Sequence, residues 1–192
     1  MPQADRIMAL DLPSDEAALP EQLRAYFDKC REKLGLVPNV LKAYVHNPRK
    51  LSGFITFYNE LMLGESELTK LEREMVAVVV SSTNHCYYCL VAHGQAVRAL
   101  ADDPQLGEML AMNYRVAELE PRHRTMLAFA WKLTKHPDLI TDDDRAALRE
   151  AGFSESAIFD LAEVAGFFNM SNRVAAAVDM MPNPEYHAMN RG

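Results

Sequence analysis

The chain has 192 residues, of which 49% are hydrophobic and 24% charged, and its formal net charge is −7 at pH 7. This apolar content supports one domain with a sizeable core and excludes a disordered chain, and the acidic balance excludes a nucleic-acid binder. The longest aliphatic stretch, Met75 to Val80, is far shorter than the roughly 20 residues that span a bilayer. Three cysteines do not suit a secreted disulfide scaffold, so we expect a cytoplasmic protein that contacts neither nucleic acid nor membrane.

Helix boundaries recur along the whole chain, with proline or a capping residue at the start and glycine or Asn-Pro at the end. No alternating strand pattern with a hairpin signal occurs, so the fold class is all-α, with a weak internal repeat. The tail after Pro182 is expected to be irregular. In chain order, the expected helices cover residues 20–35, 38–46, 48–63, 69–80, 86–100, a short stretch from 104, 121–135, 141–152 and 154–178.

A polar break at residues 81–85 separates two of these helices, and the pair Cys86-x-x-Cys89 follows it. Residues three and four apart share one helix face, so both cysteines and His93 line the same face, at a helix start whose dipole lowers a thiol pKa. An imidazole there can take the thiol proton. If the break turns the chain back, the Glu74 carboxylate faces the same site and orients the ring.

The residues alone leave three interpretations of this segment open. Cys86, Cys89 and His93 supply three of the four ligands of a zinc site, with His85 or Glu74 as a remote fourth. The two cysteines can also be buried apolar side chains without chemistry. The spacing of the acid and the imidazole favours the third interpretation, a redox-active pair.

The spacing Glu74-x11-Cys86-x2-Cys89-x3-His93 resembles that of the AhpD-like alkylhydroperoxidases, which belong to the all-helical carboxymuconolactone decarboxylase superfamily. The wider stretch of residues 82–93 and the later segment Phe167-Phe168-Asn169-x-x-Asn172-Arg173 are similar to the peroxidase-related branch. The resemblance covers about residues 35–180. It predicts a single AhpD-like domain over residues 1–192, with an N-terminal helical extension and an irregular C-terminal tail.

The resemblance implies thiol-dependent reduction of small hydroperoxides without metal or other cofactor. It assigns Cys89 as the attacking thiol, Cys86 as the resolving thiol, and Glu74 with His93 as the proton relay. An external dithiol or lipoyl-type donor then reduces the disulfide. The alternatives are a dithiol–disulfide reductase that serves a peroxiredoxin, and a non-catalytic zinc-bound or partner-binding member of the fold.

The resemblance also implies a homo-oligomer, since family members form dimers, trimers and hexamers. One departure concerns the residue before the second cysteine, where the best-studied members carry histidine and this chain has Tyr88. A phenol is neutral near pH 7 and is no equivalent base, although it can donate a hydrogen bond. Tyr88, Asn84 and His85 are therefore candidates for the substrate pocket rather than for the relay.

Overall fold

The computed structural model describes residues 3–191, and this part of the chain is all-α as the sequence predicts. Residues 1, 2 and 192 of the predicted single domain lie outside the described residues. The α-helices of residues 3–191 are Glu21–Leu34 (α1), Asn39–Ala43 (α2), Pro48–Leu63 (α3), Lys70–Thr83 (α4), Tyr87–Ala101 (α5), Pro104–Asn113 (α6), Pro121–Lys135 (α7), Asp142–Glu150 (α8) and Glu155–Ala177 (α9).

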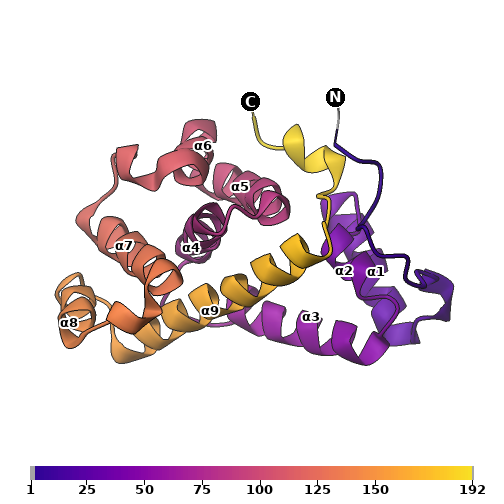
Figure 1. The fold of residues 1–192 in the computed structure, drawn as a ribbon, viewed down its shortest axis with the longest axis horizontal. Coiled ribbons are helices and arrows are strands. Elements are labelled where there is room, and N and C mark those ends of the chain that lie inside the picture. Colours follow the sequence, from indigo (N-terminus) through magenta and orange to yellow (C-terminus); the bar gives the residue numbers. More distant parts are fainter. Residues whose placement is uncertain (1–2, 192) are drawn as a thin grey trace.

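Helix α4 lies at the centre of the main core and packs against α5, α6, α7 and α9 (Figure 1). Its segment from Met75 to Val80 is at most 1% exposed, because helices cover it on every side. The same run of β-branched residues is compatible with a buried strand, but the capping box at Thr69 starts a helix here. Thr69 Oγ1 accepts the N–H of Glu72, whose carboxylate accepts the N–H of Thr69 in return.

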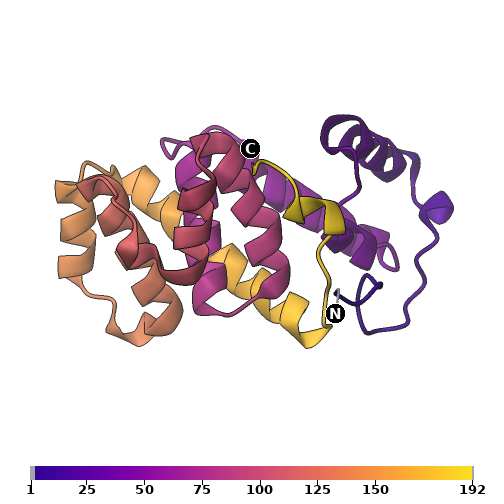
Figure 2. The same cartoon turned by 90° about the horizontal axis from the view of Figure 1, so that it is seen from above.

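A second, smaller core joins α1, α2 and the first half of α3. Helix α1 ends as expected at Gly35, whose φ of 74° is the left-handed conformation that glycine adopts without strain. Figure 2 shows the indigo segment that holds α1 and the orange segment that holds α7 and α8 at opposite ends of the molecule. Phe54 of α3 contacts both cores, and it stacks on Tyr44 with ring centroids 5.0 Å apart.

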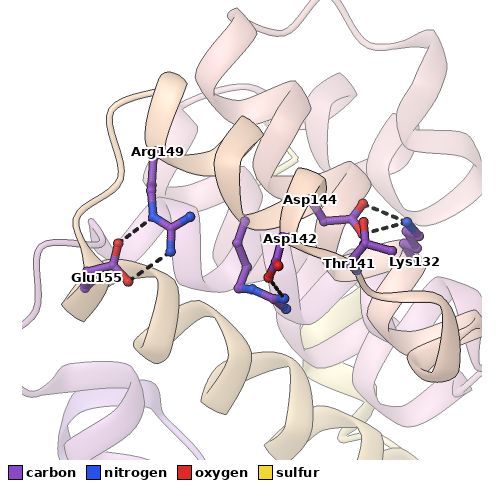
Figure 3. Close-up of polar contacts among 7 residues, drawn as sticks. Lys132, Thr141, Asp142, Asp144, Arg149 and Glu155 are labelled. Carbon is purple, nitrogen blue, oxygen red and sulfur yellow. Dashed lines mark hydrogen bonds and ion pairs between the residues drawn. The ribbon is translucent and has the colours of Figure 1, made fainter.

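Ion pairs and a cap fix the position of α8 (Figure 3). Asp144 accepts the backbone N–H of Thr141 at 2.8 Å and pairs with Lys132 of α7 at 2.6 Å. Arg149 pairs with Glu155 at the start of α9. The acidic run of residues 142–144 is therefore the helix cap that the sequence predicts.

Up to residue 191, the chain after Pro182 has no α-helix or strand, and its one regular element is a short 3-10 turn. It forms a 3-10 turn at Pro184–His187 and packs on α5. Arg98 of α5, only 6% exposed, donates hydrogen bonds to the carbonyl oxygens of Tyr186 at 3.1 Å and Met189 at 2.9 Å. Gly107 of α6 leaves room for this arginine, because a Cβ atom there would lie 2.8 Å from its Cγ.

The N-terminal segment pairs with the chain that follows α9, and the two chain ends in Figure 1 lie on the same side of the molecule. The N–H of Ala9 donates to the carbonyl of Val178 at 2.8 Å, and that of Met181 donates to the carbonyl of Ile7 at 2.9 Å. Among residues 3–191, no helix is both long and apolar enough to cross a membrane.

We predict that Arg98→Ala lowers the free energy of unfolding by about 2–3 kcal/mol, because it leaves two tail carbonyls without their charged donor. The tail should also become a preferred site of limited proteolysis. Urea unfolding and a timed trypsin digest measure the two effects. Arg149→Ala, which breaks the exposed pair with Glu155, is the control and should cost about 1 kcal/mol or less. Equal effects of the two substitutions would contradict the anchoring role of Arg98.

Candidate active site

The chain reverses direction between α4 and α5 over residues 84–86. Helix α4 continues through Ser81, Ser82 and Thr83, so the break is shorter than the sequence predicts. Two of these hydroxyls have backbone partners, since Thr83 donates to the carbonyl of Val79 within α4 and Ser82 donates to that of Ala111 in α6. His85 then adopts a positive φ of 54°, and Cys86 is the N-cap of α5. The reversal lays α5 against α4.

A network of amides ties this reversal to α9. Asn84 donates to the side-chain oxygens of Asn169 at 3.1 Å and Asn172 at 3.0 Å. Asn172, which is buried, donates in turn to Ser81 at 3.0 Å. The Asn84 side chain therefore joins the reversal to α9, where Asn169 and Asn172 accept its two hydrogen bonds.

The reversal brings Glu74 of α4 against His93 of α5, with Oε2 and Nδ1 2.6 Å apart. Both side chains are largely buried, with 11% and 12% exposed. A carboxylate only accepts, so Nδ1 donates, and the Nε2 atom of the neutral ring is left as an unprotonated base. The edge of Phe168 packs on the imidazole with ring centroids 4.6 Å apart, which fixes the plane of the ring.

The two thiols lie at the start of α5, and both are reduced and buried, Cys86 being 3% and Cys89 1% exposed. A hydrogen bond from the Cys89 side chain lowers the pKa of Cys86 to about 7, against the opposing effect of burial. The backbone N–H groups at the helix start lower it further, and so does His93 whenever its ring is protonated. The same pairing and burial raise the pKa of Cys89. The pair therefore loses its first proton near neutral pH, and the remaining proton lies between the two sulfurs.

A cavity of about 530 Å³ opens beside the thiols and the relay. Cys89, His93 and Glu74 line it, whereas Cys86 does not. Most of the remaining wall is apolar or aromatic and comes from both cores, from α9 and from the C-terminal tail. Wall residues include Tyr26, Cys30, Phe54, Ile55, Tyr58, Tyr88, Phe167, Phe168, Tyr186 and Met189.

Of the three residues that the sequence suggests for the substrate pocket, only one lines the cavity. Tyr88 lies in the wall, where its hydroxyl accepts the N–H of Val40 at 3.0 Å. Asn84 and His85 do not line the cavity, because Asn84 faces α9 and His85 is exposed at the turn. The sequence analysis missed Tyr58 and Tyr186. Tyr58 follows the apolar period of α3 and resembles a core residue, and Tyr186 lies in the segment that was expected to be irregular.

The side chains of residues 3–191 also bear on the zinc interpretation. Within this range, no group of three or more His, Cys, Asp and Glu side chains is arranged to hold a metal ion. Glu74 and His93 are instead bonded to each other, and the Cys86 thiolate is balanced by a thiol donor and helix N–H groups. The arrangement suits proton and thiol chemistry.

We predict that Cys89→Ala raises the pKa of Cys86 from about 7 towards that of an ordinary thiol, roughly 8.5, because the main hydrogen bond to the thiolate is lost. Thiolate is the form above the pKa, so the ultraviolet absorbance of thiolate at pH 7 should fall in the variant. A pH series of spectra measures the midpoint. Cys30→Ala is the control, since burial raises the pKa of that thiol and keeps it protonated near neutrality. An unmoved midpoint in Cys89→Ala would contradict the pairing.

Comparison with known proteins places the chain in a family. The family model of carboxymuconolactone decarboxylases matches residues 48–130. An uncharacterized peroxidase-related protein from Silicibacter sp. TM1040 is 59% identical over the full length of both chains, with a TM-score of 0.95.

A peroxidase-related protein from Ralstonia eutropha JMP134, described as an alkylhydroperoxidase AhpD core, is 39% identical over 98% of this chain and 99% of its own, with a TM-score of 0.94. The debrominase Bmp8 is 19% identical over 96% of each chain, with a TM-score of 0.77, and shares the fold. A search among curated proteins finds no match. The chain belongs to the carboxymuconolactone decarboxylase family, among its AhpD-like, peroxidase-related proteins.

Proposed function

We propose that the protein is a thiol peroxidase that reduces organic hydroperoxides with the Cys86–Cys89 pair. The observation that carries the proposal is the shared cavity of Cys89, His93 and Glu74, with Cys86 directly behind Cys89. A nucleophile, an oriented base and a second thiol are the groups that this reaction needs. The peroxidase-related relatives support the same class of activity.

The roles of the two thiols follow from access and charge. The resting negative charge favours Cys86, yet only Cys89 lines the cavity that a substrate can enter. Cys89 becomes the thiolate when its proton moves to His93, because Glu74 holds Nδ1 and leaves Nε2 free to accept it. His93 is then the imidazolium, and Cys86 keeps its thiolate. Cys89 is therefore the attacking sulfur and Cys86 the resolving sulfur.

In the first step, the Cys89 thiolate attacks the terminal oxygen of the hydroperoxide. The O–O bond breaks, an S–O bond forms, and the alkoxide leaves with the electron pair and receives a proton from the His93 imidazolium. The products are an alcohol and a sulfenic acid on Cys89. In the second step, the Cys86 thiolate attacks that sulfur, an S–S bond forms and the S–O bond breaks, and hydroxide leaves with the electron pair and takes a proton from solvent to become water.

The burial of both sulfurs limits the reductant that restores the dithiol. Cys89 is reached through the cavity, and Cys86 is packed against the N-terminal segment and the chain after α9. A rigid protein surface cannot reach either sulfur without displacing these segments. A small dithiol, or a lipoyl-type dithiol on a flexible arm, fits the entrance and reduces the disulfide by thiol–disulfide exchange.

The direct test mixes reduced protein with cumene hydroperoxide in a stopped-flow thiol assay. We expect rapid loss of two thiols in the wild type, and in Cys86→Ser a stable sulfenic acid on Cys89 that dimedone traps. Cys89→Ser should react only at the background rate of an ordinary thiol. Cys30→Ala, with both thiols of the pair intact, is the positive control. A wild-type rate equal to that of Cys89→Ser would exclude the peroxidase function.

The relay has its own test in Glu74→Gln. An amide at this position cannot balance the charge of the imidazolium, so we expect the rate of Cys89 oxidation to fall about 100-fold. Glu60→Gln, an exposed change on α3, should leave the rate unchanged. Single-turnover kinetics with cumene hydroperoxide at pH 7 measure both variants. Equal rates in Glu74→Gln and the wild type would show that the relay is not used.

A further inference from the structure

Tyrosine hydroxyls in the cavity wall fall into two groups. The Tyr26 hydroxyl donates to Asn59 at 3.0 Å, and the Tyr88 hydroxyl accepts the N–H of Val40 at 3.0 Å. No hydrogen bond from the described residues reaches the hydroxyls of Tyr58 and Tyr186. Two of these four phenols thus have partners in the protein and two do not.

The unpartnered hydroxyls belong to two residues that line the cavity. Within residues 3–191, the only side-chain nitrogen or oxygen that is both sealed from open space and unpaired is Nε of Arg73. The Tyr58 and Tyr186 oxygens are unpaired without being sealed, and both residues line the cavity. A buried polar group normally has a partner, so these two hydroxyls have the character of a binding site for a ligand oxygen.

Both tyrosines line the same cavity as Glu74, Cys89 and His93, and their pKa values respond to that surrounding. Burial, and then the negative charge of Glu74, raise the pKa of Tyr58 well above its usual value, and Tyr186 and Cys89 also contribute. Burial likewise raises the pKa of Tyr186, with a contribution from Glu74. Both phenols therefore stay protonated at neutral pH and act as donors. They come from distant segments, Tyr58 from α3 and Tyr186 from the tail that Arg98 anchors.

We propose that Tyr58 and Tyr186 are catalytic residues that donate hydrogen bonds to the oxygens of the bound hydroperoxide. The aromatic side chains of Phe54, Phe167 and Phe168 hold its apolar body in the same cavity.

This inference rests on the proposed peroxidase function. As Cys89 attacks the terminal oxygen, negative charge grows on the oxygen that leaves as alkoxide. Two neutral phenols that donate hydrogen bonds to that oxygen would stabilise the charge before the proton arrives from His93.

The two hydroxyl donors and the aromatic wall determine which ligands the site favours. Two donors beside an apolar wall favour a molecule with one or two oxygens on a bulky hydrocarbon body. Hydrogen peroxide meets the donors but leaves the aromatic wall empty. The same site binds the alcohol product, since the alcohol keeps the oxygen and the body, and it discriminates against a hydrocarbon of the same shape.

The test compares Tyr58→Phe, Tyr186→Phe and Tyr26→Phe, in which each change removes one oxygen and keeps the ring. Tyr26 is the matched control, because it lines the same cavity and its hydroxyl already serves Asn59. The first readout is the rate of Cys89 oxidation by cumene hydroperoxide. We expect a fall of roughly 10- to 100-fold in the Tyr58 and Tyr186 variants and none in the Tyr26 variant.

The second readout does not depend on turnover. Calorimetry measures the binding of cumyl alcohol and of cumene to Cys89→Ala protein that carries each tyrosine change. The preference for the alcohol over the hydrocarbon should fall about tenfold when Tyr58 or Tyr186 becomes phenylalanine, and should persist in Tyr26→Phe. A merely structural role would weaken both ligands equally.

The outcomes separate the two proposals. Slower oxidation together with a lost alcohol preference, confined to the Tyr58 and Tyr186 variants, supports the assignment. Equal effects in all three variants, or no effect in any, overturn it. A wild type that does not react with the hydroperoxide, while the alcohol preference still depends on Tyr58 and Tyr186, rejects the peroxidase function and supports the hydroxyl site.

Discussion

The amide network at the α4–α5 reversal is the constraint on which the rest of the site depends. Asn84, Asn172 and Ser81 hold the turn against α9, and the turn alone decides which residue of α4 faces α5. A shift of one residue in this turn would rotate α4 by about 100° relative to α5 and remove Glu74 from His93. Because Asn172 is buried, each of its bonds must be made within the protein. The polar network thus fixes the register of α4 against α5. Apolar contacts alone would specify this register less strictly, because they are not directional.

Around this register, the protein gathers four titratable groups in one largely buried region. The carboxylate pairs with the imidazole and the two thiols pair with each other, and the thiol pair holds its negative charge on Cys86. Buried charge without such partners would cost several kcal/mol, so the pairs form a unit rather than a collection of independent residues. Within the unit, the Cys89 thiol and one helix start stabilise an anionic sulfur at Cys86, while Cys89 is the sulfur that lines the cavity. The charged sulfur and the accessible one are thus different residues, and under the proposed function a proton must move before Cys89 can attack.

Much of the fold and the central part of the site could be predicted from the sequence, because both depend on local signals. Caps such as Thr69, Asp103 and Ser154 start helices where the sequence indicates, and the spacing of Cys86, Cys89 and His93 follows from one helix. The predicted contact from Glu74 to His93 is present because the reversal occurs, although three polar residues assigned to the break are helical. Tyr58 and Tyr186 could not be found in this way. The role proposed for them depends on a cavity between segments more than a hundred residues apart. The spacing of residues within one helix does not predict which distant segments come together.

The pairing of the N-terminal segment with the chain after α9 has a consequence for how the protein matures. Ala9 and Val178 are joined across nearly the whole sequence, and the tail that holds Tyr186 reaches back to Arg98 over 88 residues. Contacts of such long range form late, since closing the chain must precede any gain from them. As the chain leaves the ribosome, α5 and its two thiols are complete before the chain after α9 is made. Until then, neither the pairing with the N-terminal segment nor the contact of the tail with Arg98 can form. The reactive cysteines therefore pass through a stage in which they are open to oxidants of every size. Once the N-terminal segment and the tail have packed, the two thiols are buried, and Cys89 is reached only by a molecule that fits the cavity.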